Sequence, residues 1–230
     1  MKWIDFFKNL FFLFYPRVCP GCSKSLMENE EFLCLECLLR LPKTNYHRCS
    51  ENPAFERFLG KVPVCSAVSY LYYNKGGLGQ KLVEEIKYRG NIYLGEWLGV
   101  QLANDMRSSG FFEDIDYLIP VPLHSSKQRK RGFNQSEVLA KGIASVTGIP
   151  VENSILYRQR ANVSQTRKGV YERWKNTEGI FNTKNGARVG EKHILLIDDV
   201  LTTGATLEAC MQPFLKEKNV RISVLTLAIT

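Results

Sequence analysis

The most constraining feature of the sequence is an apolar strand that leads into two adjacent acids and a loop of small residues. Residues 193–197 (HILLI) suit a strand inside a sheet. Asp198 and Asp199 follow directly, then a threonine–glycine loop, and residues 205–218 have the apolar spacing of a helix. In parallel α/β sheets, ligands bind beyond the carboxyl ends of such strands.

Predicted strands and helices alternate through most of the chain after residue 63. Helical spacing recurs over residues 78–89, 94–106 and 135–146, and strands are expected over 64–73, 116–121, 151–156 and 220–228. Asn134 is expected to cap the helix that follows it. The predicted fold class is therefore α/β, with a mostly parallel sheet flanked by helices.

Two C-x-x-C pairs, separated by eleven residues, precede this domain. Each pair lets two thiolates reach one ion from a tight turn, and two pairs complete a tetrahedral zinc site. The ion would supply folding energy that so small a module cannot obtain from its own core. A redox pair, disulfides, or replacement of a ligand by His47 or Cys49 are the alternatives. The predicted zinc ligands are Cys19, Cys22, Cys34 and Cys37.

The first fifteen residues, MKWIDFFKNLFFLFY, are apolar and aromatic. Charged residues interrupt them, no small-residue cleavage site follows, and the unbroken run Leu10–Tyr15 is far short of a bilayer span. We expect an amphipathic helix that packs on the protein itself, the alternative being a helix on a membrane surface. No transmembrane segment is predicted, and the expected location is the cytoplasm, where cysteines are reduced.

The loop after the two acids has the composition of a phosphate-binding loop. Small residues let backbone N–H groups approach a ligand, and threonine hydroxyls add donors, although no G-x-x-x-x-G-K-[ST] run occurs. Two carboxylates would repel a phosphate unless they also held a ribose diol or Mg²⁺. A solvated polar turn and a phospho-acceptor aspartate are the alternatives. The candidate residues are Asp198, Asp199, Thr202, Thr203, Gly204, Ala205 and Thr206.

The positive charge of the chain is concentrated in one stretch. The formal net charge is +8, and residues 122–175 contain eleven Lys or Arg against three Asp or Glu, which accounts for all of it. Such a field attracts phosphates, either on a small molecule or on nucleic acid. Aromatic residues among these charges could stack bases, although each is also a candidate for packing: Phe133, Tyr157, Tyr171 and Trp174.

Three blocks of sequence carry a resemblance to known proteins. LLIDDVLTTGAT (195–206) resembles the phosphoribosyl pyrophosphate (PRPP) motif of type I phosphoribosyltransferases. Two further blocks, PVPLHSSKQRKRGFNQSEVLA (120–140) and RQRANVSQTRKGVYERWKNTEGIF (158–181), narrow the match. Together with the double C-x-x-C, they make nearly the whole chain similar to the ComF/ComFC family, which is associated with DNA uptake in natural transformation.

The predicted organisation is an amphipathic N-terminal helix (1–16), a zinc finger (17–50), a linker with little periodicity (51–63) and a type I phosphoribosyltransferase-like domain (64–230). The resemblance implies a set of roles for residues of this last domain. The two acids would hold ribose hydroxyls and are the candidates for catalysis, residues 202–206 would hold the 5-phosphate, and Mg²⁺ would accompany PRPP. The pyrophosphate loop and lid would include Leu123, His124, Lys127, Arg131, Gln165, Thr166 and Arg167.

Three functions are compatible with these features. The first is a ComF-type protein with a PRPP or ribose 5-phosphate site that handles single-stranded DNA, together with other competence proteins. The second is an active phosphoribosyltransferase that moves ribose 5-phosphate onto a nitrogen base, for which no base-specific pocket is recognisable. The third is a regulator that senses PRPP without turnover.

Overall fold

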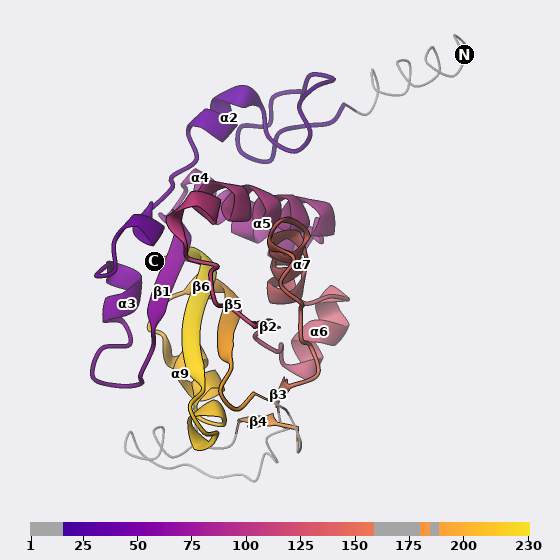
Figure 1. The fold of residues 1–230 in the computed structure, drawn as a ribbon. Helices are drawn as coiled ribbons and strands as arrows, with labels where there is room; N and C mark the ends of the chain where they lie inside the picture. Colours follow the sequence, from indigo (N-terminus) through magenta and orange to yellow (C-terminus); the bar gives the residue numbers. More distant parts are fainter. Residues whose placement is uncertain (1–15, 159–179, 185–188) are drawn as a thin grey trace.

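The fold is built on a four-stranded, fully parallel sheet with the strand order β1-β6-β5-β2. Figure 1 shows it in the computed structural model, which describes residues 16–158, 180–184 and 189–230. Because the strands are parallel, their carboxyl ends meet at one edge of the sheet. The strands are β1 (Ser66–Tyr72), β2 (Tyr117–Pro120), β5 (His193–Leu201) and β6 (Arg221–Ile229), with a separate antiparallel pair, β3 (Leu156–Arg158) and β4 (Phe181–Thr183).

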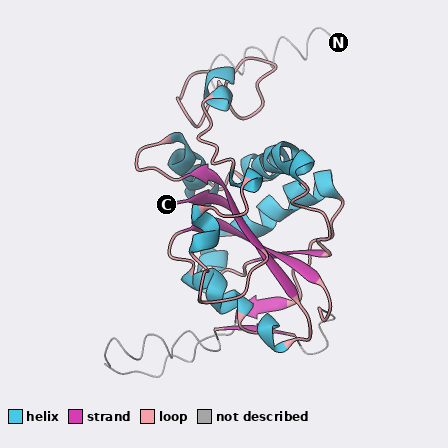
Figure 2. Cartoon of the chain, turned by 60° about the vertical axis from the view of Figure 1, so that its left-hand side comes forward, coloured by secondary structure: helices cyan, strands magenta, loops and turns pink. Residues whose placement is uncertain are grey.

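Helices cover both faces of the sheet (Figures 1 and 2). Successive strand residues point to opposite faces, so Leu195 and Ile197 join one apolar cluster while Ile194 and Leu196 join the other. The first cluster contains α4 (Leu78–Arg89), α5 (Ile92–Met106) and α7 (Gln135–Thr147), and the second contains α3 (Pro53–Glu56) and α9 (Ala205–Met211). The described helical segments also include α2 (Leu35–Leu39), η1 (Tyr46–Arg48), η2 (Arg107–Ser109), α6 (Ser125–Arg131) and η3 (Phe214–Lys216).

Two glycines let α5 and α7 cross at close range. A Cβ on Gly99 would lie 2.4 Å from the carbonyl oxygen of Leu139, and one on Gly142 would lie 2.0 Å from that of Glu96. A larger residue at either position would therefore push the helices apart. The close crossing fixes α7 against the sheet, with the first turn of the helix next to the end of β5.

The cysteine module packs against α4 and α5. The ammonium group of Lys81 on α4 donates a hydrogen bond of 2.9 Å to the carbonyl oxygen of Gly21. The rings of Phe32 and Trp97 lie 5.8 Å apart, and Cys19 is part of the same apolar cluster as α4 and α5. The module therefore shares its core with the main domain.

The sequence predicted the α/β class, the four strands of the parallel sheet and the helices α4, α5 and α7, and the structure confirms them. The strand expected over 151–156 is wrong, because Val151 forms only an isolated bridge to Leu118 and β3 begins at Leu156.

The helix expected over 205–218 is too long, because α9 ends at Met211 and Pro213 cannot continue it. The strand expected over 193–197 is too short, because β5 stays paired with β6 as far as Leu201. The pyrophosphate loop and lid were expected to include Lys127 and Arg131, but residues 125–131 form α6.

Two further expectations concern the start of the chain and the membrane. The N-terminal helix expected over residues 1–16 lies, apart from its last residue, outside the described residues. In the part of the chain that the structure describes, no helix combines the length and the apolar character needed to cross a bilayer.

Candidate functional site

The two adjacent acids lie among the last paired residues of β5, at the carboxyl edge of the sheet. Asp198 and Asp199 are both partly buried, and Asp198 is in register with Thr226 of β6. The expected position, just beyond the strand, is therefore wrong by a few residues, but the expected edge is correct. Ligands of parallel sheets bind at this edge.

Asp198 is held by donors from its own strand and from α7. Its Oδ1 accepts a hydrogen bond of 3.0 Å from the hydroxyl of Ser136 and one of 2.9 Å from the backbone N–H of Asp199. Burial and the neighbouring charge of Asp199 raise the pKa of Asp198 to about 7, against the effect of these donors and of Lys87. The pair therefore resists carrying two full charges at neutral pH unless a further partner compensates them.

Asp199 forms an ion pair with a helix on one face of the sheet. The ammonium group of Lys87, near the end of α4, lies 2.9 Å from Asp199 Oδ1, and both side chains are 18 % exposed. The two residues line a small cavity together with Gln135 of α7. Lys87 was not predicted as a site residue, because an i, i+4 pattern on a helix gives no sign of a contact to a distant strand.

The start of α7 places the residues around Arg131 close to the acid pair. Asn134 caps this helix by accepting from the N–H of Ser136, as predicted, and its amide donates to the carbonyl oxygen of Val121 beyond β2. The guanidinium of Arg131 donates a hydrogen bond of 2.8 Å to Gln135 Oε1. Residues from 131 to 136 therefore connect the basic helix α6 with the end of β5.

The threonine–glycine loop lies between β5 and α9. Gly204 has φ +86°, a left-handed conformation that favours glycine, and a Cβ there would lie 3.2 Å from the ring of Phe58. Phe58 is fully buried and belongs to the segment expected to be a linker. In the same segment, the ammonium group of Lys61 forms an ion pair with Glu208 of α9 at 2.9 Å. The predicted linker thus packs against the loop and the start of α9. The sequence did not predict this contact, because the segment has little helical or strand periodicity.

The predicted pyrophosphate loop follows β2 and leads into α6. His124 caps α6 through Nδ1, which accepts from the N–H of Ser126, and Leu123 is partly buried beside it. Lys127 is exposed on α6, and Arg131 ends the helix. The structure brings this loop to the same edge of the sheet as the acids. The predicted lid residues Gln165, Thr166 and Arg167 lie outside the described residues.

A basic and an aromatic side chain meet at the end of α6. The guanidinium of Arg131 is 5.6 Å from the ring centroid of Tyr88, which is 74 % exposed. Tyr93, at the start of α5, is 75 % exposed. Of the aromatics predicted from the sequence, Phe133 is partly buried against the core and Tyr157 is 40 % exposed. Tyr171 and Trp174 fall outside the described residues. Sequence reasoning missed both exposed tyrosines because they lie outside the basic stretch.

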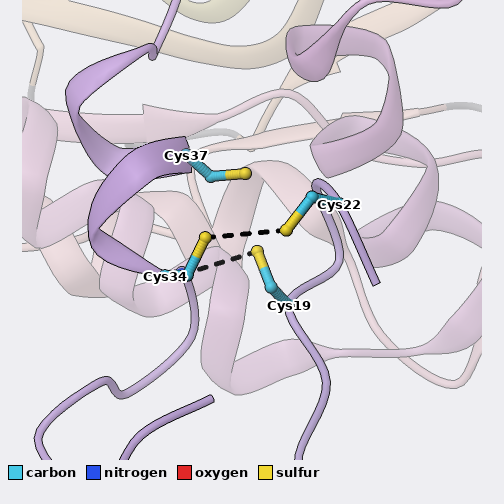
Figure 3. A group of neighbouring side chains, drawn as sticks. All are labelled: Cys19, Cys22, Cys34 and Cys37. Atoms are coloured by element: carbon cyan, nitrogen blue, oxygen red, sulfur yellow. Dashed lines mark hydrogen bonds between the residues drawn. The ribbon is translucent and has the colours of Figure 1, made fainter. Parts of the chain in front are cut away.

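The four cysteines of the two C-x-x-C pairs form one cluster, as predicted (Figure 3). Their sulfur atoms lie within 4.8 Å of one another, and those of Cys22 and Cys34 are 3.6 Å apart. Four thiolates around one tetrahedral zinc would be about 3.8 Å apart, given Zn–S bonds of about 2.3 Å. His47 and Cys49 are described in the structure, and neither is part of the cluster.

Backbone donors favour a thiolate at Cys19, whereas burial and the neighbouring thiols raise the pKa of Cys37. Burial would raise the pKa of the Cys19 thiol, but hydrogen bonds from the backbone at Cys34, Cys22 and Gly21 outweigh it and lower this pKa to about 7. N–H groups that point at metal-binding sulfurs orient the ligands and reduce the cost of deprotonation. The donor set therefore fits a structural metal ion.

Known proteins resemble this chain over most of its length. It is 28 % identical over 221 residues to the "Competence protein ComFC" of Bacillus subtilis, an alignment that covers 94 % of this chain and 86 % of that protein. The chain is a relative of the ComF/ComFC proteins. The "Competence protein F" of Haemophilus influenzae is 27 % identical over 132 residues, which are 55 % of this chain and 57 % of that protein.

A second group of relatives has another name. The "DNA utilization protein YhgH" of Salmonella typhimurium is 25 % identical over 220 residues, covering 93 % of this chain and 90 % of that protein. No family model matches the chain. The resemblance to ComF/ComFC proteins predicted from the sequence is nevertheless confirmed by the named relatives.

Solved structures with some likeness to the chain include phosphoribosyltransferases. The adenine phosphoribosyltransferase of Leishmania donovani aligns with a TM-score of 0.41 at 13 % identity, over 70 % of this chain and 83 % of that one. The glutamine PRPP amidotransferase of Bacillus subtilis aligns with a TM-score of 0.38 at 20 % identity. That alignment covers 56 % of this chain but only 25 % of the amidotransferase.

The cysteine cluster generates a first prediction. Replacing Cys37, a buried member of the cluster, by serine removes one of four thiolates, so the bound metal should fall from about one ion per chain to near zero. The unfolding temperature should fall with it, because the module shares its core with α4 and α5. Metal content by mass spectrometry and thermal unfolding measure the two effects.

The matched control is Cys49→Ser, which changes an exposed cysteine outside the cluster. It should leave both metal content and unfolding temperature unchanged. Equal metal content in Cys37→Ser and the wild-type protein would contradict a four-cysteine site.

Proposed function

We propose that the protein binds PRPP or a related ribose 5-phosphate compound at the carboxyl edge of its sheet. The observation that carries the proposal is the juxtaposition of the acid pair on β5, the glycine–threonine loop after it and the loop after β2. A ribose diol can donate hydrogen bonds to carboxylates, and the small residues at 202–206 allow a phosphate to approach the backbone.

Each part of the ligand has a candidate partner. Asp198 and Asp199 accept the ribose hydroxyls, and residues 202–206 receive the 5-phosphate. The pyrophosphate of PRPP, with its Mg²⁺, lies toward residues 122–127 and Arg131, whose positive charge offsets it. Gln165, Thr166 and Arg167 would act as a lid over the bound ligand. These assignments follow from the order of the elements along the edge and from the resemblance of the three sequence blocks.

We further propose that the protein serves DNA uptake by handling single-stranded DNA; its relatives are named competence proteins and a DNA utilization protein. The supporting observation is the pairing of the basic helix α6 with the exposed ring of Tyr88 through Arg131, which combines positive charge with an aromatic ring. Proteins that bind single strands without sequence preference combine these same features. Other competence proteins are the expected partners, and the cytoplasm is the expected compartment.

Zinc is the metal we propose for the cysteine cluster. Four thiolates in a closed, partly buried cluster suit a structural zinc ion, whose contribution is folding energy rather than chemistry. The ion would hold the module against α4 and α5.

An active phosphoribosyltransferase is the second candidate function. It would use the same ribose and pyrophosphate partners and would release pyrophosphate when a nitrogen base attacks the sugar. The basic side chains near 127–131 could stabilise the departing pyrophosphate. Pyrophosphate release in the presence of a panel of bases distinguishes this function from binding alone.

The ligand site is tested by thermal unfolding with PRPP and Mg²⁺. A ligand at about 100 times its Kd stabilises a protein by about 2.7 kcal/mol, which for a chain of this size raises the unfolding temperature by roughly 5–10 °C. The variant Asp198→Asn with Asp199→Asn should lose this rise, because an amide accepts hydroxyl protons less strongly and carries no charge.

A second pair of neighbouring acids supplies the control. Glu113 and Asp114 are exposed and lie at the opposite edge of the sheet, before β2. Glu113→Gln with Asp114→Asn should keep the full rise in unfolding temperature. An undiminished rise in the Asp198 and Asp199 variant would refute the site.

The nucleic-acid surface is tested by binding to a fluorescent single-stranded oligonucleotide at several salt concentrations. Lys127→Gln with Lys130→Gln should weaken binding and reduce the slope of log K against log salt by up to about 0.7 for each phosphate that the variant no longer neutralises. The control Lys216→Gln with Lys218→Gln removes two exposed charges after α9 and should change neither quantity. Identical salt slopes in both variants would count against DNA binding by α6.

A further inference from the structure

We propose that Lys87 is a built-in cation of the sugar-phosphate site, which takes the place of a divalent metal ion beside Asp199. Ribose 5-phosphate would then bind at the acid pair without Mg²⁺, and the metal would be needed only for a pyrophosphate group. The inference rests on the proposed function, because it concerns the same site. It assigns a positioning role to α4, an element outside the three sequence blocks that point to PRPP.

The ion pair between Lys87 and Asp199 is well placed for this role. The two charged groups lie 2.9 Å apart, and each side chain is only 18 % exposed, so the pair is shielded from solvent and salt. In the described ranges 16–158, 180–184 and 189–230, it is the one ion pair formed by either acid. Lys87 therefore supplies the positive charge in direct contact with the acids.

The pair leaves room for a ligand hydroxyl. Lys87 contacts Oδ1 of Asp199, and a carboxylate has a second oxygen with its own lone pairs. Oδ2 can accept a hydroxyl proton while Oδ1 keeps the lysine. Lys87 thus need not move away when a sugar binds, and it fixes the orientation of the carboxylate in advance.

A second observation at the same place also points to a ligand. The amide nitrogen of Gln135 is buried and has no hydrogen-bond partner among the described residues, although the side chain is only 3 % exposed. Gln135 lines the small cavity that Lys87 and Asp199 also line. Arg131 fixes the amide group of Gln135 by donating a hydrogen bond to its Oε1. A buried donor of this kind is costly unless it meets an acceptor, such as a hydroxyl oxygen or a water that bridges to the ligand.

Charge balance explains why a cation is needed here. Two carboxylates next to a phosphate repel it, and Asp198 already titrates near neutral pH because burial and its neighbour raise its pKa. A lysine in contact with Asp199 removes most of one negative charge from the field that the phosphate meets. In many sites a divalent metal ion does this, but an ammonium group requires no dissolved cofactor.

The experiment measures the Kd of ribose 5-phosphate, a ligand that lacks pyrophosphate, by calorimetry in buffer freed of Mg²⁺ without a chelator and in buffer with Mg²⁺. The wild-type protein should bind with the same Kd in both. Lys87→Met keeps most of the length of the side chain but not its charge, and it should bind about tenfold or more weakly without Mg²⁺. Mg²⁺ should restore part of that affinity in the variant, since the ion can then neutralise Asp199.

Two further variants separate charge from folding. Lys87→Arg keeps the charge and should retain metal-independent binding. Lys141→Met is the matched control. It also removes a lysine from an ion pair, the one with Glu137 at 3.0 Å on α7, but this pair does not involve either acid of the site. It should bind as the wild-type protein does. Circular dichroism and thermal unfolding of each variant establish that it is folded.

The outcomes are distinct. A wild-type protein that binds ribose 5-phosphate only with Mg²⁺ would overturn the role of Lys87 and leave the proposed site standing, and this arm needs no variant. Equal or tighter binding by folded Lys87→Met without Mg²⁺ would also overturn it, because the lysine would then contribute nothing to binding or would compete with the sugar. No binding by the wild-type protein in either buffer would overturn the proposed site and this inference together.

Discussion

Two neighbouring carboxylates at the end of a buried strand must be compensated before any anion can bind beside them. The fold does this with groups from two helices on one face of the sheet. Ser136 at the start of α7 donates to Asp198, and Lys87 near the end of α4 pairs with Asp199. The position of these helices therefore decides whether the acid pair is usable.

The helices are placed by interactions far from the acids. Gly99 and Gly142 allow α5 and α7 to approach closely, which sets the first turn of α7 against β5. At its other end, α4 carries the cysteine module through the hydrogen bond from Lys81 to Gly21. The same helix thus contacts both the cysteine module and the acid pair, so the module contributes to the framework of the site.

Much of the site could be predicted from the sequence because its parts are local. The strand, the acids and the loop follow one another directly, and the four cysteines have the spacing of a metal site. Lys87, Phe58 and Tyr88 could not be found in this way, because their roles depend on contacts between segments distant in the chain. Element ends were also missed where pairing decided them, as at Leu201, which stays in β5 because β6 continues beside it.

The central claim is that a sugar phosphate binds where β5 passes into the loop before α9. A crystal structure of the protein with ribose 5-phosphate tests it most directly. The account predicts the phosphate within hydrogen-bond distance of backbone N–H groups of residues 202–206, and ribose hydroxyls on the carboxylates of Asp198 and Asp199. A ligand bound elsewhere, or carboxylates turned away from the sugar, would contradict it.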